Sequence, residues 1–266
     1  MGFMEKISVI IINWNVGESF ARCIKSVLDT KYPNLELILI DNNSNKPPKI
    51  PKDPRVTYIQ NESNLGFPAA VNQGLKLFVG DYVLLLNPDT RIQNDFFTKA
   101  IESIQFNKKI GIMGPKFVDP DGTTQGSVYR EPSIIRTIQE YWFGKTNLTE
   151  KYTLNTNNLT EVDVVIGACM FMSKKIVKKV GLFTDKVFIF YEDFDYCRRI
   201  RKAGYKVIFN PNITIIHEHG QSTKQNPLAN ELLMKASLWY NGMLKHYILW
   251  FVIWTSQKVN KILLKS

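Results

Sequence analysis

The stretch Leu84-Leu85-Leu86-Asn87-Pro88-Asp89-Thr90 decides the fold class of this chain. Its leucines predict a buried strand, and Asp89 follows directly after the carboxyl end of that strand. In an open α/β sheet, ligands bind outside the carboxyl ends of the strands, so Asp89 is expected where a metal or phosphate ligand would lie. The acidic cluster Glu192-Asp193-Phe194-Asp195 and then His217 follow downstream. This order predicts a functional site at one edge of a sheet.

Apolar strands alternate with helical periodicity on both sides of this stretch. The expected strands are residues 8–13, 35–40, 56–59, 82–86, 110–113, 206–209 and 213–217. The expected helices cover residues 20–28, 71–78, 97–104 and 194–202. Periodicity fades between residues 122 and 161 and apolar order returns at 162–172. The alternation predicts an α/β fold with a mostly parallel, doubly wound sheet flanked by helices, in which both halves of the chain share one sheet.

Length and composition predict a cytoplasmic globular protein. At 266 residues and 44% hydrophobic, the chain can bury a full core as one large domain or two closely packed ones. Its three cysteines, Cys23, Cys169 and Cys197, are widely spaced and match neither a disulfide framework nor a zinc pattern, which fits a reducing compartment. The short apolar run at residues 7–12 has no small-residue cleavage site after it and is expected to be the first strand.

A formal net charge of +10 favours an acidic partner, which could be nucleic acid, an anionic membrane or a phosphorylated small molecule. From Leu228 onward the chain carries five lysines against Glu231 alone. The apolar segment 247–254 in this tail is far shorter than the ~20 residues that span a bilayer. With its tryptophans and flanking lysines it suits an amphipathic helix at an anionic lipid surface, and a helix docked on the protein's own core is the alternative.

Two common phosphate-binding motifs are absent from the sequence. No Gly-x-Gly-x-x-Gly follows the first strand, where residues 13–17 read NWNVG, and there is no Walker-type Gly-Lys-Ser/Thr. Polar residues stand instead at successive strand ends: Asn13, Asp41 with Asn42, Asn64 to Phe67, and Asn87 to Asp89. Each is an ordinary turn residue when taken alone. Four such groups in order predict one polar edge of the sheet.

The ordered segments SVIIINWN, DNNS, NLGFPAAVNQG, LLLNPDT, GACMFMSKKIVKKVGLFTD, YEDFDYCRRIRKAGYKV and HEHGQS resemble the family 2 inverting glycosyltransferases, particularly their bacterial rhamnosyltransferase-like branch. The resemblance covers roughly residues 6–250. It implies a GT-A fold over residues 1–225, with a nucleotide-sugar-binding half at about 1–115 and an acceptor-binding half with the catalytic base at 116–225. Residues 226–266 would form a C-terminal helical extension.

The resemblance implies a set of residues that bind the nucleotide-sugar. They are Asn13, Asp41, Asn42, Asn64, Gly66, Phe67, Asn87, Gly167 and Ala168. Asp41 would hydrogen-bond the pyrimidine base, although an Asx turn at DNNS is the alternative. The loop with Asn64, Gly66 and Phe67 would pass over the nucleoside. Gly167 and Ala168 would lie beneath the donor sugar, where close backbone packing explains small residues equally well.

The resemblance also implies a divalent metal, Mn²⁺ or Mg²⁺. Asp89 matches the metal-binding carboxylate of the family's DXD motif, where the ion bridges protein and diphosphate. His217 would be a further ligand, with His219 as the competing candidate. Asn87 stands where the motif usually has its first aspartate, and the loss of that negative charge should weaken metal affinity.

Asp193 matches the catalytic base of the family. Inversion at an anomeric carbon needs one base that takes the proton of the acceptor hydroxyl. Glu192 could orient a sugar hydroxyl or cap a helix, and Asp195 and Arg199, four residues apart, are expected to form an ion pair that fixes the motif. An acidic first turn that complements the helix dipole is the structural alternative for the cluster.

Two further expectations concern charge and acceptor. Arg130 or Arg198 could stabilise the negative charge on the departing diphosphate. Residues 122–161, which include Tyr141-Trp142-Phe143, are expected to face the acceptor, because aromatic rings stack on sugars, or to form a partner surface.

The resemblance implies transfer from a UDP- or dTDP-sugar, with dTDP-rhamnose favoured, to a glycan or polyprenyl-diphosphate-linked acceptor in bacterial surface polysaccharide synthesis at the inner face of the plasma membrane. A sugar nucleotidyltransferase is one alternative, but these enzymes normally begin with a glycine-rich basic loop that SVIIINWNVGES lacks. A nucleic-acid-binding protein is the other. Its basic residues would interleave with aromatic residues on one surface, whereas the basic clusters here lie apart along the chain, so we expect no nucleic-acid partner.

Overall fold

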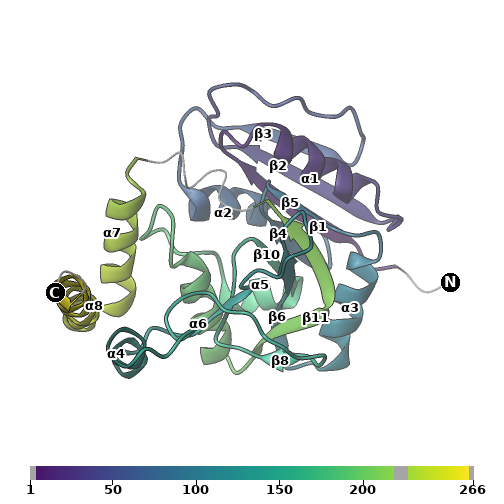
Figure 1. The fold of residues 1–266 in the computed structure, drawn as a ribbon. Helices are drawn as coiled ribbons and strands as arrows, with labels where there is room; N and C mark the ends of the chain where they lie inside the picture. The colour runs from purple at the N-terminus through teal and green to yellow at the C-terminus, as the bar shows by residue number, and fades with distance from the viewer. Residues whose placement is uncertain (1–3, 219–226, 264–266) are drawn as a thin grey trace.

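The computed structural model describes residues 4–218 and 227–263, which form an α/β sheet flanked by helices and a C-terminal pair of helices to one side (Figure 1). The strands are β1 (Ile7–Asn13), β2 (Leu35–Asp41), β3 (Val56–Gln60), β4 (Tyr82–Leu86), β5 (Thr90–Arg91), β6 (Ile110–Val118), β7 (Val128–Tyr129), β8 (Thr160–Glu161), β9 (Val164–Val165), β10 (Cys169–Ser173) and β11 (Lys206–His217). The helices are α1 (Glu18–Leu28), α2 (Phe67–Leu77), α3 (Phe96–Phe106), α4 (Ile134–Phe143), α5 (Lys174–Val180), α6 (Glu192–Lys202), α7 (Ala229–Asn241) and α8 (Met243–Leu263).

The main sheet has the strand order β3-β2-β1-β4-β10-β6-β11-β5, with β8 paired to β11. Strands β3, β2, β1 and β4 are parallel neighbours, and β6 is parallel to β11. Strand β10 lies antiparallel between β4 and β6. Because β10 comes from the second half of the chain, both halves build one sheet, as the sequence predicts.

Burial on both faces explains the nearly continuous apolar strands. Every residue of β1 and β4 is buried, which is the pattern of strands covered by helices on both sides. Alternate residues of β1 divide between two hydrophobic clusters, since successive side chains point to opposite faces. Ile11 belongs to the cluster that includes Phe20 of α1, and Ile10 belongs to the cluster that includes Val71 of α2.

Helix α4 and strand β11 are two of the elements that differ from the sequence prediction. Helix α4 lies within residues 122–161, where periodicity is weak; Ser133 caps it by accepting from the Arg136 N–H, and Gly144 ends it at a φ of 66°. The two strands expected at 206–209 and 213–217 are the single strand β11, with a register shift between Asn210 and Thr214. The Asn-Pro-Asn sequence there interrupts the pairing without ending the strand, because proline has no N–H to donate.

The C-terminal helices α7 and α8 meet at Gly242, whose φ is 75°. Helix α8 lies beside α4, and the Trp142 Nε1–H donates to the carbonyl oxygen of Val252 over 3.2 Å. Helix α8 is therefore docked on the protein, yet it leaves a set of large apolar side chains exposed: Met243, Leu244, Tyr247, Trp250, Phe251 and Trp254. None of the helices in the described part of the chain is both long and apolar enough to cross a membrane.

Candidate functional site

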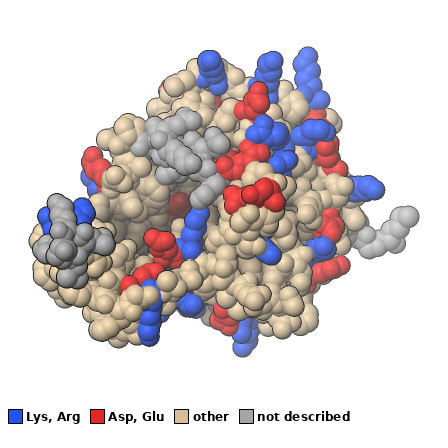
Figure 2. All heavy atoms as spheres, viewed as in Figure 1, with Lys and Arg blue, Asp and Glu red and all other residues tan. Residues whose placement is uncertain are grey.

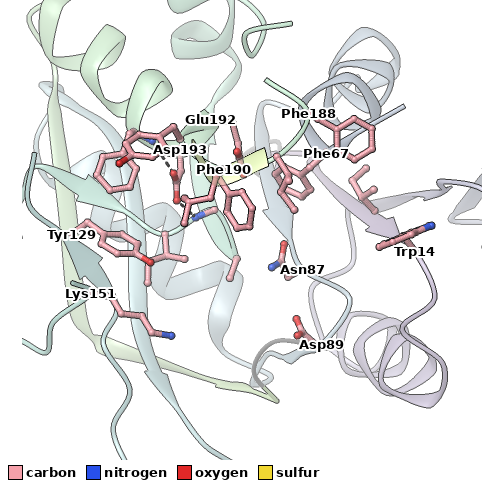
Figure 3. A pocket seen from close by; sticks show the side chains of 18 of the residues that line it. Trp14, Phe67, Asn87, Asp89, Tyr129, Lys151, Phe188, Phe190, Glu192 and Asp193 are labelled. Carbon is pink, nitrogen blue, oxygen red and sulfur yellow. Dashed lines mark hydrogen bonds between the residues drawn. The ribbon is translucent and has the colours of Figure 1, made fainter. Parts of the chain in front are cut away.

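A cavity of about 610 Å³ lies at the carboxyl ends of β1 and β4 and is bounded by both halves of the chain (Figure 3). Most of the candidate site residues line it. They are Asn42, Asn64, Phe67, Asn87, Asp89, Gly167, Ala168, Glu192, Asp193 and His217. Side chains separated by more than 170 positions in the sequence thus meet in one space.

Asp193 faces this cavity from the first turn of α6. Its Oδ2 accepts a hydrogen bond from the Gly167 N–H at 3.1 Å, and its Oδ1 accepts from the Phe194 N–H at 2.8 Å (Figure 3). The side chain is buried, and this burial raises the pKa of Asp193 to about 6, against the opposing effect of the two N–H donors. Asp193 is therefore a carboxylate of fixed orientation that is ionised near neutral pH.

Glu192 lies beside Asp193 but has a different protonation preference. Burial, and then the charge of Asp193, raise the pKa of Glu192 to about 8. Its Oε2 is buried without a hydrogen-bond partner among the described residues. Two neighbouring carboxyl groups with separated pKa values divide naturally into an acid and a base, and here Asp193 is the one that ionises first.

The backbone that leads into α6 is strained. Phe190 and Tyr191 have φ values of 74° and 62°, in the left-handed region that bulky residues rarely adopt. Both residues line the cavity directly before Glu192. Strain of this kind persists only where the surrounding structure enforces it and is frequent at functional sites. The turn delivers the acidic motif into the cavity.

Asp195 and Arg199 form the expected ion pair, with Arg199 Nε 2.8 Å from Asp195 Oδ2. Arg199 Nη1 also donates to the carbonyl oxygen of Val180 at the end of α5 over 2.9 Å. Neither side chain lines the cavity. They join α6 to α5 and support the acidic motif from behind.

Asp89 and His217 approach each other on the opposite side of the cavity. His217 ends β11, and its Nε2 lies 3.6 Å from Oδ1 of Asp89. Gln125 orients the imidazole: its Oε1 is 3.0 Å from His217 Nδ1 and its Nε2 donates to the His217 carbonyl oxygen over 2.7 Å. Oδ1 of Asp89 is buried and has no hydrogen-bond partner in the described part of the chain.

This pair fits a divalent metal. A carboxylate and an imidazole held by a further hydrogen-bonding side chain are suitable ligands for Mn²⁺, and the buried oxygen of Asp89 lacks another partner among the described residues. Within residues 4–218 and 227–263, no group of three or more His, Cys, Asp or Glu side chains is close enough to hold a metal by itself. Diphosphate oxygens and water would have to complete the coordination. His219, the competing candidate, lies outside the described residues.

The wall of the cavity that the first half of the chain forms is a network of amides and aromatic rings. Asn42 Nδ2 donates to Asn64 Oδ1 over 2.6 Å, and Trp14 and Phe67 line the wall nearby (Figure 3). Gly66 has a φ of 84°, and a Cβ there would lie 2.6 Å from the carbonyl oxygen of Phe188. Glycine is therefore required at position 66, although the residue packs behind the cavity and does not line it.

Asn13 and Asp41 also lie outside the lining of the cavity. Asp41 is fully buried; its Oδ1 accepts from Asn13 Nδ2 at 2.7 Å and from Ser44 Oγ at 2.6 Å, while Oδ2 accepts from the Ser44 N–H at 3.0 Å. This is the Asx turn that the sequence offered as the alternative. Recognition of a base by Asp41 remains a prediction and would require this turn to open.

The structure corrects the expectation about the arginines and bears in part on the expectation about residues 122–161. Neither Arg130 nor Arg198 lines the cavity, because Arg130 lies over the Tyr152 ring at 4.3 Å and Arg198 pairs with Glu131 at 3.0 Å. Within residues 122–161, the cavity is lined by Tyr129, Thr149, Glu150 and Lys151. The aromatic residues 141–143 lie outside the lining, and the Trp142 Nε1–H donates to the Val252 carbonyl oxygen of α8.

Several lining residues were missed by the sequence analysis. They are Trp14, Tyr129, Glu150, Lys151, Phe188, Phe190 and Leu233. Trp14 stands in the NWN segment, and Phe188 and Phe190 directly precede the acidic motif, so position in the sequence could have indicated these three. Tyr129, Glu150 and Lys151 fall in the stretch with weak periodicity and have no local signal.

The mixed α/β sheet, with a cavity at its strand ends, is similar in fold to solved GT-A glycosyltransferases. Among solved structures, the chain is similar to GalNAc-T7 with UDP, GalNAc and Mn²⁺, with a TM-score of 0.63, 19% identity, and coverage of 82% of this chain and 44% of that one. It is also similar to the mannosyltransferase PcManGT from Pyrobaculum calidifontis in complex with GDP-Man and Mn²⁺, with a TM-score of 0.57, 13% identity, and coverage of 92% and 64%.

The sequence identifies the family. The model of glycosyl transferase family 2 matches residues 8–181, and the chain belongs to that family. The N-acetylglucosaminyl-diphospho-decaprenol L-rhamnosyltransferase of Mycobacterium tuberculosis is 24% identical over 248 residues, which cover 85% of this chain and 80% of the relative. The dTDP-rhamnosyl transferase RfbF of Shigella flexneri is 25% identical over 203 residues, which cover 74% and 64%. The predicted family is confirmed, and the protein is a glycosyltransferase.

Proposed function

We propose that this glycosyltransferase moves a sugar from a UDP- or dTDP-sugar, with dTDP-rhamnose favoured, to a glycan or polyprenyl-diphosphate-linked acceptor in bacterial surface polysaccharide synthesis. One observation carries the proposal: the oriented carboxylate of Asp193 and the Asp89–His217 pair face one cavity. The rhamnosyltransferase names of two relatives support the choice of donor.

The donor would lie along the wall that contains Asn42, Asn64 and Trp14, with its diphosphate toward Asp89 and His217. These two residues would hold Mn²⁺ or Mg²⁺, which when bound supplies positive charge to the leaving diphosphate. Gly167 would lie under the sugar. A Cβ at position 167 would come no nearer than 3.7 Å to Asp193, so the missing side chain gives space to a ligand and is not demanded by protein packing.

Asp193 would act as the base of an inverting displacement. The acceptor hydroxyl attacks the anomeric carbon from the side opposite the diphosphate, its proton passes to Asp193, and the bond between the anomeric carbon and the diphosphate oxygen breaks. Hydrogen bonds from Gly167 and Phe194 hold the carboxylate in place before the acceptor arrives. Inversion would convert dTDP-β-L-rhamnose into an α-linked product.

We also propose that α8 rests on the anionic inner face of the plasma membrane, so that the enzyme is a peripheral membrane protein. The exposed aromatic residues Tyr247, Trp250 and Phe251 form an apolar surface, and Trp250 and Trp254 stack at 5.8 Å. Lysines at positions 245, 258 and 261 of the same helix complement anionic lipid. Aromatic and basic residues on one helix are typical of helices that lie in the membrane interface.

The chain offers less support to a nucleic-acid partner. On the face shown in Figure 2, lysine and arginine side chains are interspersed with aspartate and glutamate and form no continuous basic stripe. The groove of a nucleic-acid-binding protein would be expected to be basic, whereas the cavity here contains Asp89, Glu150, Glu192 and Asp193.

Turnover with a donor panel tests the proposed function. The full chain is incubated with UDP-, dTDP- and GDP-sugars and a prenyl-diphosphate-linked N-acetylglucosamine acceptor, with Mn²⁺ or with a chelator. We expect transfer from one dTDP- or UDP-sugar that depends on metal, and an inverted anomeric configuration by NMR of the product. Retention of configuration would contradict the role of Asp193, and failure of every donor would contradict the transferase proposal.

A further inference from the structure

The charge of the cavity does not match the charge of the groups that the proposed reaction brings into it. Four carboxyl groups line the cavity, of which Glu192 holds its proton near neutral pH: Asp89, Glu150, Glu192 and Asp193. Lys151 is the one lysine or arginine among the described residues that line it. A nucleoside diphosphate and a lipid-linked diphosphate are both strongly anionic. Among these lining residues, Lys151 is the side chain whose positive charge can attract them.

The backbone around Lys151 is fixed on the protein. The next residue, Tyr152, pairs with β7: its N–H donates to the Val128 carbonyl oxygen at 2.9 Å, and its own carbonyl oxygen accepts from the Ser127 N–H at 3.0 Å. A Cβ at Gly126 would lie 2.8 Å from the carbonyl carbon of Lys151, so the two segments are in close contact. The lysine therefore extends from a rigid base and not from a free loop.

Lys151 and Asp89 project into the cavity from opposite walls, as Figure 3 shows. Lys151 belongs to the acceptor half and Asp89 follows β4 of the nucleotide half. A group that sits between them is in reach of the lysine ammonium on one side and the candidate metal ligands on the other. Phosphate oxygens are the ligands that both a lysine and a divalent metal accept.

Burial of Lys151 also has an energetic cost. The cation is partly buried, and this lowers the pKa of Lys151, while Asp119 and then Glu150 act in the opposite direction. A charged group in a site of reduced dielectric interacts more strongly with an incoming anion than a lysine on the surface does. The two arginines expected to serve this purpose are engaged elsewhere, Arg130 over Tyr152 and Arg198 with Glu131.

We propose that Lys151 is a binding residue for a diphosphate group inside the cavity, either the diphosphate of the donor nucleotide or that of a lipid-linked acceptor. The inference rests on the proposed function, because the reaction supplies both groups. It adds a cation from the acceptor half to a site whose metal-binding motif has Asn87 in place of an aspartate.

Equilibrium binding by the full chain tests this assignment without a turnover assay. The probes are UDP and dTDP for the donor and farnesyl diphosphate for the acceptor, each in the presence of Mn²⁺. Lys151→Met removes the charge and Lys151→Arg keeps it. Lys178→Met is the matched control, because Lys178 is exposed on α5 in the same half of the chain.

We expect Lys151→Met to weaken binding of a diphosphate probe by about tenfold or more, as for a lost hydrogen bond to a charged group. Lys151→Arg and Lys178→Met should remain close to the unmodified protein. A loss with UDP or dTDP assigns Lys151 to the leaving group, and a loss with farnesyl diphosphate alone assigns it to the acceptor. If the unmodified protein binds the probes and Lys151→Met binds them equally, the assignment is overturned while the proposed function stands. If the unmodified protein binds none of the probes, both are overturned.

Discussion

The backbone N–H of Gly167 donates a hydrogen bond to Oδ2 of Asp193 over 3.1 Å. This bond connects the segment between β9 and β10 to the first turn of α6, so the proposed floor of the sugar site and the proposed base are fixed relative to each other. Positioning of this kind matters for catalysis, because a small misplacement of a reacting group costs a large part of the rate.

Asp193→Asn should abolish transfer and leave donor binding intact. The amide is nearly the same size as the carboxylate but cannot accept a proton from the acceptor, so we expect kcat to fall by about 10²–10⁴-fold. The Kd of UDP or dTDP, measured by calorimetry with Mn²⁺, should change little. Asp185→Asn is the control, because the side chain of Asp185 is 82% exposed. An Asp193→Asn enzyme with normal turnover would remove Asp193 from the role of base.

The two buried carboxyl groups predict a pH dependence of activity. Because the pKa of Asp193 is raised to about 6, kcat/KM should rise as the pH increases through that value and the base loses its proton. Rates measured from pH 5 to pH 8 in buffers of constant ionic strength check this. An activity that is flat across this window, or that falls from pH 5 to pH 7, would contradict the assignment.

Glu192→Gln should change how stability depends on pH. The folded-state pKa of Glu192 is raised to about 8 from an ordinary value of 4.5, so the folded protein holds a proton that the unfolded chain releases. Stability from this group is present below about pH 4.5 and is lost as the pH rises toward 8. Urea unfolding should therefore show Glu192→Gln gaining stability relative to the unmodified protein between these pH values. A difference that does not vary with pH would argue against a protonated Glu192.

The Asp89–His217 pair, which we propose as metal ligands, gives a prediction with two variants. Asp89→Ala should abolish the gain in UDP or dTDP affinity that is expected from Mn²⁺, because its carboxylate is the proposed anionic ligand of the metal. Gln125→Ala leaves both ligands in place but frees the His217 imidazole, and it should weaken Mn²⁺ binding by about 10–100-fold. Titration of Mn²⁺ into the protein with dTDP measures both, with Asp185→Ala as the control. Unchanged metal dependence in Asp89→Ala would exclude Asp89 from the site.

Tyr240 connects α7 to the start of α6, the helix that contains the proposed base Asp193. Its hydroxyl lies 2.8 Å from each carboxylate oxygen of Glu131 and donates its single hydrogen to that carboxylate, and its ring lies 5.0 Å from that of Tyr191. Tyr240→Phe should cost about 1.5–3 kcal/mol in the free energy of unfolding, as for a lost hydrogen bond to a charged group. The matched control Tyr247→Phe changes an exposed tyrosine of α8 and should stay within about 0.5 kcal/mol in urea unfolding. Equal effects would mean that the Glu131 contact contributes no stability.

The sequence predicts the parts of this site that depend on local pattern. Asp89 lies in the cavity because an apolar strand ends directly before it, and Asp193 lies there because its motif begins a helix. Lys151 has no such signal, since its position follows from pairing between Tyr152 and Val128, which lie far apart in the chain. The turn at Asp41 is also local in sequence, but Asn13, which donates a hydrogen bond to Asp41, lies on the neighbouring strand. A sequence pattern therefore cannot tell whether the Asp41 carboxylate is occupied by Asn13 or available to a ligand.

The exposed face of α8 predicts binding to anionic membranes. Trp250→Ser together with Phe251→Ser removes two aromatic side chains that are 45% and 57% exposed, so folding should be little affected while apolar burial in lipid is lost. Co-sedimentation with phosphatidylglycerol vesicles should show binding by the unmodified protein and a loss of about tenfold or more in the variant. Phe106→Ser is the control, because Phe106 is 81% exposed at the end of α3, on the side of the molecule away from α8 (Figure 1).

Vesicles of phosphatidylcholine alone test the contribution of the lysines, and equal binding to both lipids would exclude an electrostatic role for them. If the double variant sediments as well as the unmodified protein, α8 is not the membrane-binding surface and its exposed face must serve another contact.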